Sequence, residues 1–154
     1  MSQANLIQEK MLPPPAVQTT RDYFEYSLDF GNIAAGSTVN GNIQIQADSD
    51  FMWLLGTYWA AITGALNQTA DTQIIPPITV QITDSGSGRQ ILSQAVPIDA
   101  GPFSRSSSLP YPLNPPRVFK ARSNIQFVAN NLHPANSYRL FLVLHGQKIF
   151  TYQP

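Results

Sequence analysis

Apolar and polar residues alternate with a period of two over much of the chain after Asp22. The first such segment runs to Phe30 and places three aromatic residues and a leucine on one face, with mainly polar side chains on the other. This alternation is typical of a strand that has one buried face. Gly31 and Asn32 are expected to end the strand, because both residues favour turns.

The same alternation predicts further strands. A second strand after Gly36 places its apolar residues, from Val39 to Ala47, on one face and amide side chains on the other. The aromatic and β-branched content of residues 51–63 favours a buried strand over a helix. Alternating runs also occur at 78–82, 125–129, 138–145 and 148–152, and Gly146 is expected to separate the last two.

Turn-forming residues separate these segments. Asp84 to Gly88 predicts a hairpin connection into residues 89–93. Six prolines from Pro97 to Pro116 remove backbone donors and predict a long ordered loop or an edge segment. A pattern of about eight strands without an amphipathic helix predicts an all-β fold, an antiparallel β-sandwich or barrel, as one domain over residues 22–154.

Residues 1–21 show neither strand nor helix periodicity and contain three consecutive prolines, which hold a chain extended. They predict an extended N-terminal arm outside the sandwich that docks on a partner surface. A disordered tail is the alternative, although the segment is more apolar than a solvated tail requires. The arm residues expected to contact a partner are Leu6, Ile7, Met11, Leu12, Pro13, Pro14, Pro15 and Val17.

The composition narrows the possible partners. Charged residues make up 12% of the chain, and nine basic residues balance nine acidic ones, whereas a globular average is about 25% charged. A neutral chain has no field that gathers nucleic acid or anionic lipid, so neither is expected as a partner. The missing charge repulsion favours a homo-oligomer. The absence of cysteine excludes disulfides and thiolate chemistry.

Targeting signals are not expected. The first ten residues lack the basic and apolar regions of a signal peptide. The apolar-leaning run 51–66 is too short and too interrupted to span a membrane. We therefore expect a protein that is made in the cytoplasm and has no membrane partner.

Residues that could support catalysis or metal binding are few and scattered. His133 precedes Pro134 in a turn, where a solvated side chain is expected, and His145 lies at a predicted strand end, where a hydrogen bond to the backbone is expected. Asp48 and Asp50 could form a carboxylate pair or a weak calcium loop. Turn-forming roles are favoured for both, because they separate two strands. We predict no enzyme activity, no metal site and no cofactor.

Two groups of residues are candidates for contacts between subunits. Arg117, Lys120 and Arg122 form the only local basic cluster of the sequence. The cluster is small for a nucleic-acid footprint, and it would equally guard an edge strand or form salt bridges to a neighbouring subunit. A second group consists of aromatic residues in excess of what one core requires. These aromatic residues are Tyr23, Tyr58 and Phe141.

An ordered series of short motifs spans residues 30–150. The motifs are Ala35-Gly36, Asp50-Phe51-Met52-Trp53, Asp84 with Gly88-Arg89, Pro110-Tyr111-Pro112 to Phe119, Asn131-Leu132, and Leu144-His145-Gly146-Gln147-Lys148. As a set they resemble small virion structural proteins of tailed bacteriophages, especially head decoration (cement) proteins built on a jelly roll. The resemblance implies a β-sandwich of jelly-roll type and a virion location. It also implies a structural role, in which the protein stabilises the head by binding across capsomers, with the major capsid protein or other virion subunits as partners.

A receptor- or carbohydrate-binding sandwich of a tail, fibre or neck component is the main alternative. It would use Trp53, Trp59 and tyrosines as platforms on which sugar rings stack. Both tryptophans lie in an apolar strand and are expected in the core instead, which favours the structural hypothesis. An enzyme would need a pocket of converging titratable groups, and the sequence offers no such set.

Overall fold

The alternating segments become strands in the computed structural model, which describes residues 17–63, 75–104 and 112–152. About eight strands were expected, and the described residues form seven long strands and three of two residues each. The elements are β1 (Gln18–Ile33), β2 (Thr38–Gln44), β3 (Asp50–Ile62), β4 (Ile78–Asp84), β5 (Arg89–Gln90), β6 (Val96–Pro97), the 3-10 helix η1 (Ile98–Ala100), β7 (Phe103–Ser104), β8 (Pro112–Phe119), β9 (Asn124–Asn131) and β10 (Tyr138–Tyr152).

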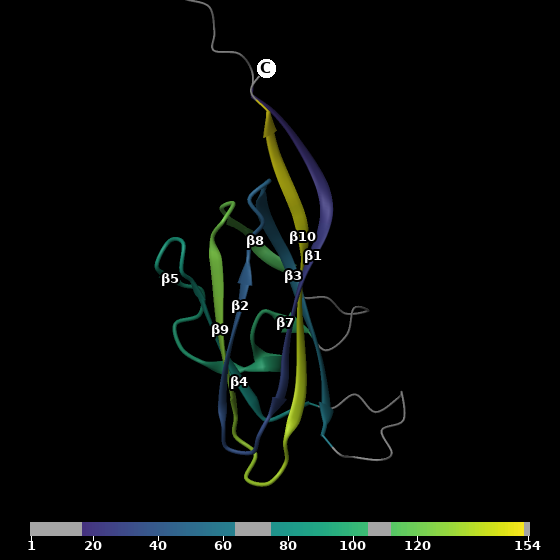
Figure 1. Cartoon of the computed structure of the whole chain (residues 1–154), viewed down its shortest axis with the longest axis vertical. Helices are drawn as coiled ribbons and strands as arrows, with labels where there is room; N and C mark the ends of the chain where they lie inside the picture. Colours follow the sequence, from purple (N-terminus) through teal and green to yellow (C-terminus); the bar gives the residue numbers. More distant parts are fainter. Residues whose placement is uncertain (1–16, 64–74, 105–111, 153–154) are drawn as a thin grey trace, which may run out of the picture.

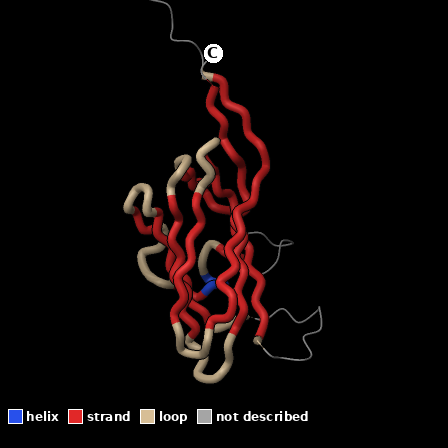
Figure 2. The backbone as a smooth tube through the Cα atoms, in the orientation of Figure 1, coloured by secondary structure: helices blue, strands red, loops and turns tan. Residues whose placement is uncertain are grey.

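The strands form two five-stranded sheets that pack face to face (Figure 1, Figure 2). Sheet A has the order β1-β10-β3, with β7 and β8 both pairing with β3. Sheet B has the order β2-β9-β4, with β5 and β6 both pairing with β4. Neighbouring strands are antiparallel except for the short β3–β7 pair, which is parallel. The predicted all-β sandwich is confirmed, and its assignment to the jelly-roll type stays a prediction.

The core lies between the sheets and follows the predicted alternation closely. In β4, Ile78, Val80 and Ile82 are at most 1% exposed, and the residues between them face outward. From sheet A, Trp53 is fully buried, and its ring lies 6.3 Å from that of Phe119. Each large apolar side chain that is fully buried stabilises the fold by about 1.5–3 kcal/mol before ordering costs.

Residues 18–21, predicted to belong to the N-terminal arm, instead form the start of a strand in sheet A. β1 begins at Gln18, which pairs with Tyr152 of β10. Residues 18–21 are polar and exposed on both sides of the strand, so an alternating pattern could not reveal them. Figure 1 shows the paired ends of β1 and β10 extending beyond the other strands. Apart from Val17, which is 56% exposed, the predicted arm contacts lie outside the described residues.

A β-bulge in β3 reverses the predicted orientation of two aromatic residues. Trp53 pairs with Gly146 and Leu55 pairs with His145, so Leu54 is one extra residue on β3. An extra residue shifts the side-chain alternation of a strand by one position. Tyr58 is therefore buried, with 4% exposure, and is not the surface aromatic that the sequence predicted. Trp59 is 54% exposed, so its predicted place in the core is wrong.

Two glycines that were expected to end strands instead lie within them. β1 continues through Gly31 to Ile33, with a register shift between Asp29 and Asn32. Gly31 adopts a φ of 65° and donates its N–H to Asp29 Oδ1 at 2.8 Å. β10 likewise continues through Gly146, where its pairing with β3 shifts register. Both glycine signals therefore mark bulges rather than strand ends.

The proline-rich segment ends in an edge strand, one of the two predicted outcomes. β8 pairs with β3 along the border of sheet A, and its Pro112 lies opposite Leu55. Proline is tolerated there because an edge strand leaves one row of backbone groups unpaired. The predicted hairpin is also present, since β4 and β5 pair across the turn between Asp84 and Arg89. Within the described ranges, no helix is long and apolar enough to cross a membrane.

Candidate interaction surface

The outward face of sheet B is polar and uncharged. Its outward positions in β2, β4 and β9 carry amides and hydroxyls, with Val128, 37% exposed, as the apolar residue among them. Such groups bond readily to water, so this face is well suited to remain in solvent. The outward side chains are Thr38, Asn40, Asn42, Gln44, Thr79, Gln81, Thr83, Asn124, Gln126, Val128 and Asn130.

The outward face of sheet A carries several apolar and aromatic side chains. Tyr23 of β1 and Trp59 of β3 are 69% and 54% exposed. Phe141 and Val143 of β10 alternate with fully buried leucines, so they point outward between β1 and β3. We call these four residues and Leu55 the aromatic face. Exposed aromatic residues gathered on one face are typical of protein interfaces.

Trp59 and Phe141 form an aromatic pair at the end of the aromatic face opposite Tyr23. Their ring centroids are 5.6 Å apart with an interplanar angle of 62°, an edge-to-face arrangement. The guanidinium of Arg139 lies 5.0 Å from the Phe141 centroid and donates to Asp29 Oδ2 at 2.9 Å. The Arg139 hydrogen bond, with a further one from the Gly31 N–H, lowers the pKa of Asp29. An ion pair whose charges cancel therefore lies beside these two rings.

A hydrogen-bonded chain of side chains lies within the aromatic face, between Tyr23 and the pair of Trp59 and Phe141. His145 Nδ1 lies 2.6 Å from Glu25 Oε1, and His145 Nε2 lies 2.8 Å from Thr57 Oγ1. The Tyr23 hydroxyl donates to Glu25 and also lies 3.2 Å from His145 Nδ1. The hydrogen bond between Tyr23 and Glu25 lowers the pKa of Glu25 and raises the pKa of Tyr23. The predicted backbone bond of His145 is therefore replaced by a side-chain network in the middle of a strand.

The order Thr57, His145, Glu25 has the connectivity of a nucleophile, a base and an orienting carboxylate. Acyl-transfer catalysis also needs free donors beside the nucleophile to hold an oxyanion. The backbone at Thr57 is paired on one side with β10 and on the other with β7, so the sheet occupies its main-chain groups. The arrangement fixes the orientation of Tyr23, the most exposed residue of the aromatic face.

Asp48 and Asp50 each form an ion pair with a different lysine side chain. Asp48 accepts a hydrogen bond from Lys148 Nζ at 2.8 Å, which lowers the pKa of Asp48. Burial raises the pKa of Asp50, but the bonds from Lys120 Nζ and the Ala121 N–H, both 2.8 Å long, outweigh burial and lower it. Asp48 therefore connects the β2–β3 turn to β10, and Asp50 connects the start of β3 to the turn after β8. The described residues include no cluster of three or more His, Cys, Asp or Glu side chains able to hold a metal ion.

Asn131 is a buried polar residue whose role the sequence did not reveal. It is fully buried, and its amide nitrogen donates to the carbonyls of Ile33, Ala34 and Asn136. Its amide oxygen accepts from the His133 N–H at 2.9 Å. His133, expected to be solvated, is half-buried and accepts from the Asn136 N–H at 2.8 Å. These two side chains shape the turn between β9 and β10.

The predicted subunit-contact residues occupy different places. Tyr23 and Phe141 belong to the aromatic face, whereas the buried Tyr58 is removed from the prediction. Lys120 and Arg122 are exposed in the turn between β8 and β9. Arg117, with a side chain that is 33% exposed, lies near the end of β8. The fold therefore separates the aromatic candidates from the basic cluster.

Comparisons with known proteins add little. No family model matches the chain, and no curated protein matches it. Among solved structures, the Drosophila NLP core, studied for its pentamer formation and histone binding, is similar at a TM-score of 0.35 and 10% sequence identity. The match covers 80% of this chain and 96% of that one. A likeness at this level carries no argument about this protein.

Proposed function

We propose that the protein is a non-enzymatic structural subunit of a virion. In this proposal it is a capsid decoration protein of jelly-roll type that stabilises a phage head by binding across capsomers. The observation that supports this most is the exposed aromatic face on a sandwich whose other face is uncharged and polar. A decoration protein needs one surface that binds its neighbours and another that remains in solvent.

The aromatic face is suited to bind a second copy of the chain. Trp and Tyr contribute much of the binding energy in many protein interfaces. The face carries Asp29 and Arg139 beside the Phe141 ring, so two copies related by a twofold axis can place opposite charges together. With a formal net charge of zero, no long-range repulsion opposes this contact.

A decoration protein does not need high affinity at any one binding site. Many symmetry-related copies bind one particle, and their contacts act together as avidity. A modest interface around Trp59 and Phe141 is then sufficient. The predicted N-terminal arm would add a second contact on a neighbouring virion subunit.

The proposed function is tested on virus particles from a culture that produces this protein. Virions are purified on a density gradient, and each fraction is analysed by quantitative mass spectrometry. The proposal predicts that peptides of this protein co-migrate with the major capsid protein in many copies per particle. Its restriction to fractions without particles would contradict the proposal.

A receptor- or carbohydrate-binding module is the second candidate, and the exposure of Trp59 favours it more than the sequence did. An exposed indole beside Phe141 could stack on a sugar ring. Acrylamide quenching and sugar titration separate the two candidates, because Trp53 is fully buried and Trp59 is not. A saturable change in Trp59 fluorescence with a sugar favours the binding module. Protection of Trp59 from acrylamide as protein concentration rises favours the structural subunit.

A further inference from the structure

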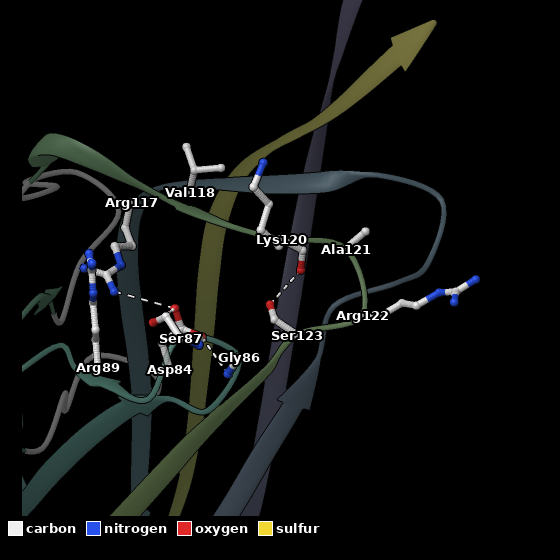
Figure 3. A pocket seen from close by; sticks show the side chains of 10 residues that line it. All are labelled: Asp84, Gly86, Ser87, Arg89, Arg117, Val118, Lys120, Ala121, Arg122 and Ser123. Carbon is white, nitrogen blue, oxygen red and sulfur yellow. Dashed lines mark hydrogen bonds and ion pairs between the residues drawn. The ribbon is translucent and has the colours of Figure 1, made fainter. Parts of the chain in front are cut away.

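A groove lies between the β4–β5 turn and the end of β8, away from the aromatic face. It has a volume of about 530 Å³ and is lined by the β4–β5 hairpin, the end of β8 and the turn between β8 and β9 (Figure 3). Arg89 of β5, Arg117 of β8 and Lys120 of the following turn bring three cations to it. Figure 3 shows the Arg122 side chain pointing away from these three. The fold thus extends the basic cluster of the sequence with Arg89, which comes from a different part of the chain.

The carboxylate of Asp84 forms the inner part of the groove and already has hydrogen-bond and ion-pair partners within the protein. It accepts from the Gly86 N–H at 3.0 Å and from the Ser87 hydroxyl at 2.7 Å. Arg117 Nη2 lies 3.6 Å from Asp84 Oδ2, a loose ion pair. Asp84 is only 6% exposed. Its role is to hold the turn and to orient Arg117, while the outer part of the groove remains positive.

The groove is a preformed feature of the fold. A Cβ at Gly86 would lie 2.7 Å from Ser123 Cβ, so the β4–β5 turn packs closely against the β8–β9 turn. The Ser123 hydroxyl donates to the Lys120 carbonyl at 2.6 Å, which fixes the second turn. A rigid site loses little entropy when it binds a ligand.

The cations of the groove are only partly neutralised. Lys120 pairs with Asp50, but its side chain is 81% exposed. The side chain of Arg89 is exposed and makes no hydrogen bond or ion pair with another residue of the described ranges. Two guanidinium groups beside one ammonium match carboxylates, because each guanidinium can donate two parallel hydrogen bonds to a carboxylate.

We propose that this groove binds carboxylate side chains of an acidic segment in a partner protein. The proposal rests on the structural function above and gives the chemistry of one partner surface. Nucleic acid fits the groove less well, because Phe119, whose ring lies 6.0 Å from the Arg117 guanidinium, is 1% exposed and cannot stack on a base. Three cations on a neutral domain also lack the extended basic stripe that a phosphate backbone requires.

The test measures binding of a fluorescein-labelled hexaglutamate peptide to the full chain by fluorescence anisotropy, at about 20 mM salt, where screening is weak. The informative variant is Arg89→Gln. Arg117 is left unchanged, because it forms the ion pair with the buried Asp84. The matched control is Arg21→Gln, which removes one exposed guanidinium near the start of β1. We expect saturable binding that weakens about fivefold in Arg89→Gln, is unchanged in Arg21→Gln and is lost at high salt. Circular dichroism melting confirms that both variants fold.

Three results would overturn the proposal. These are the absence of saturable hexaglutamate binding, equal binding by Arg89→Gln and the wild type, and tighter binding of a hexathymidylate of similar charge. The last result would assign the groove to nucleic acid. Because the peptide is added to isolated protein, the outcome does not depend on the particle experiment, and failure of one proposal can be distinguished from failure of the other.

Discussion

Gly146 of β10 lies directly against the backbone of Met52 in β3. A Cβ at position 146 would stand 2.1 Å from the Met52 carbonyl oxygen and 2.7 Å from the ring of Phe51. This close approach occurs where the pairing of β10 with β3 changes register, next to the bulge that turns Trp59 outward. Gly146 therefore permits the close approach of β10 and β3 in the sheet that presents the aromatic face.

Replacing this glycine is expected to destabilise the fold strongly. Gly146→Ala should lower the free energy of unfolding by about 2–4 kcal/mol, because the added methyl group overlaps main-chain atoms that cannot move aside. Urea denaturation measures the change. Gln147→Ala, at the neighbouring half-buried position, is the control and should change stability by less than about 0.5 kcal/mol. Equal effects of the two substitutions would show that the close approach is not needed.

Asn131 is expected to be the most sensitive polar residue of the core. Asn131→Ala removes the donor shared by three backbone carbonyls and should cost about 2–4 kcal/mol of stability. Thermal and urea unfolding provide the measurement. Asn130→Ala, one residue earlier on the outward face, should cost less than about 1 kcal/mol. A loss at Asn131 no larger than that at Asn130 would contradict the assigned role.

Stability is expected to fall on acidification. The pKa values of Glu25, Asp29, Asp48 and Asp50 are all lowered in the folded protein. A lowered carboxyl pKa stabilises the fold above the unfolded value of about 4, and this contribution is lost as pH falls through the folded pKa. The melting temperature should therefore decline below about pH 4.

Asp50 gives the sharpest check of this acid dependence. Asp50→Asn should melt lower than the wild type at pH 7, because it loses the Lys120 ion pair. The two proteins should converge as pH falls, since protonation removes the same charge from the wild type. Differential scanning calorimetry from pH 7 to about pH 3 covers this range. A constant difference between the two melting temperatures would be the contrary result.

The arm hypothesis predicts that residues 1–16 can be removed without loss of the sandwich. The truncated chain should keep the melting temperature of the full chain but lose much of its binding to particles or partner subunits. A longer truncation through residue 21 also removes the start of β1, which pairs with β10 from Gln18. It should therefore expose the end of β10 to faster hydrogen exchange. Failure of the shorter truncation to fold would show that the arm belongs to the domain.

The sequence pattern predicted the strands but not their irregularities. Alternation correctly predicted the buried faces of β4 and β9, because both strands pair without a register shift. It failed in β3, because the extra residue at Leu54 reverses the alternation beyond it. A single chain gives no local signal for such a bulge, which depends on the partner strand and on the close approach at Gly146. The exposure of Trp59 was for that reason hidden, although Tyr23 and Phe141 of the same face were predicted as surface aromatics.

Long-range pairing hid the polar networks as well. His145 and Glu25 are 120 residues apart in the chain, and Lys148 and Asp48 are 100 apart, so no local spacing connects them. The basic cluster was visible because Arg117, Lys120 and Arg122 are neighbours in sequence. Arg89, which completes the groove with Arg117 and Lys120, comes from a hairpin whose position depends on sheet B.

Sedimentation velocity over a range of protein concentrations tests most directly whether the aromatic face binds a second copy. Three proteins are compared: the wild type, Trp59→Ser, and the control Val128→Ser on the outward face of sheet B. The account predicts that the wild type and Val128→Ser form the same oligomer, while Trp59→Ser sediments as a folded monomer. A wild type that remains monomeric at all concentrations, or a Trp59→Ser variant that associates as the wild type does, would contradict it.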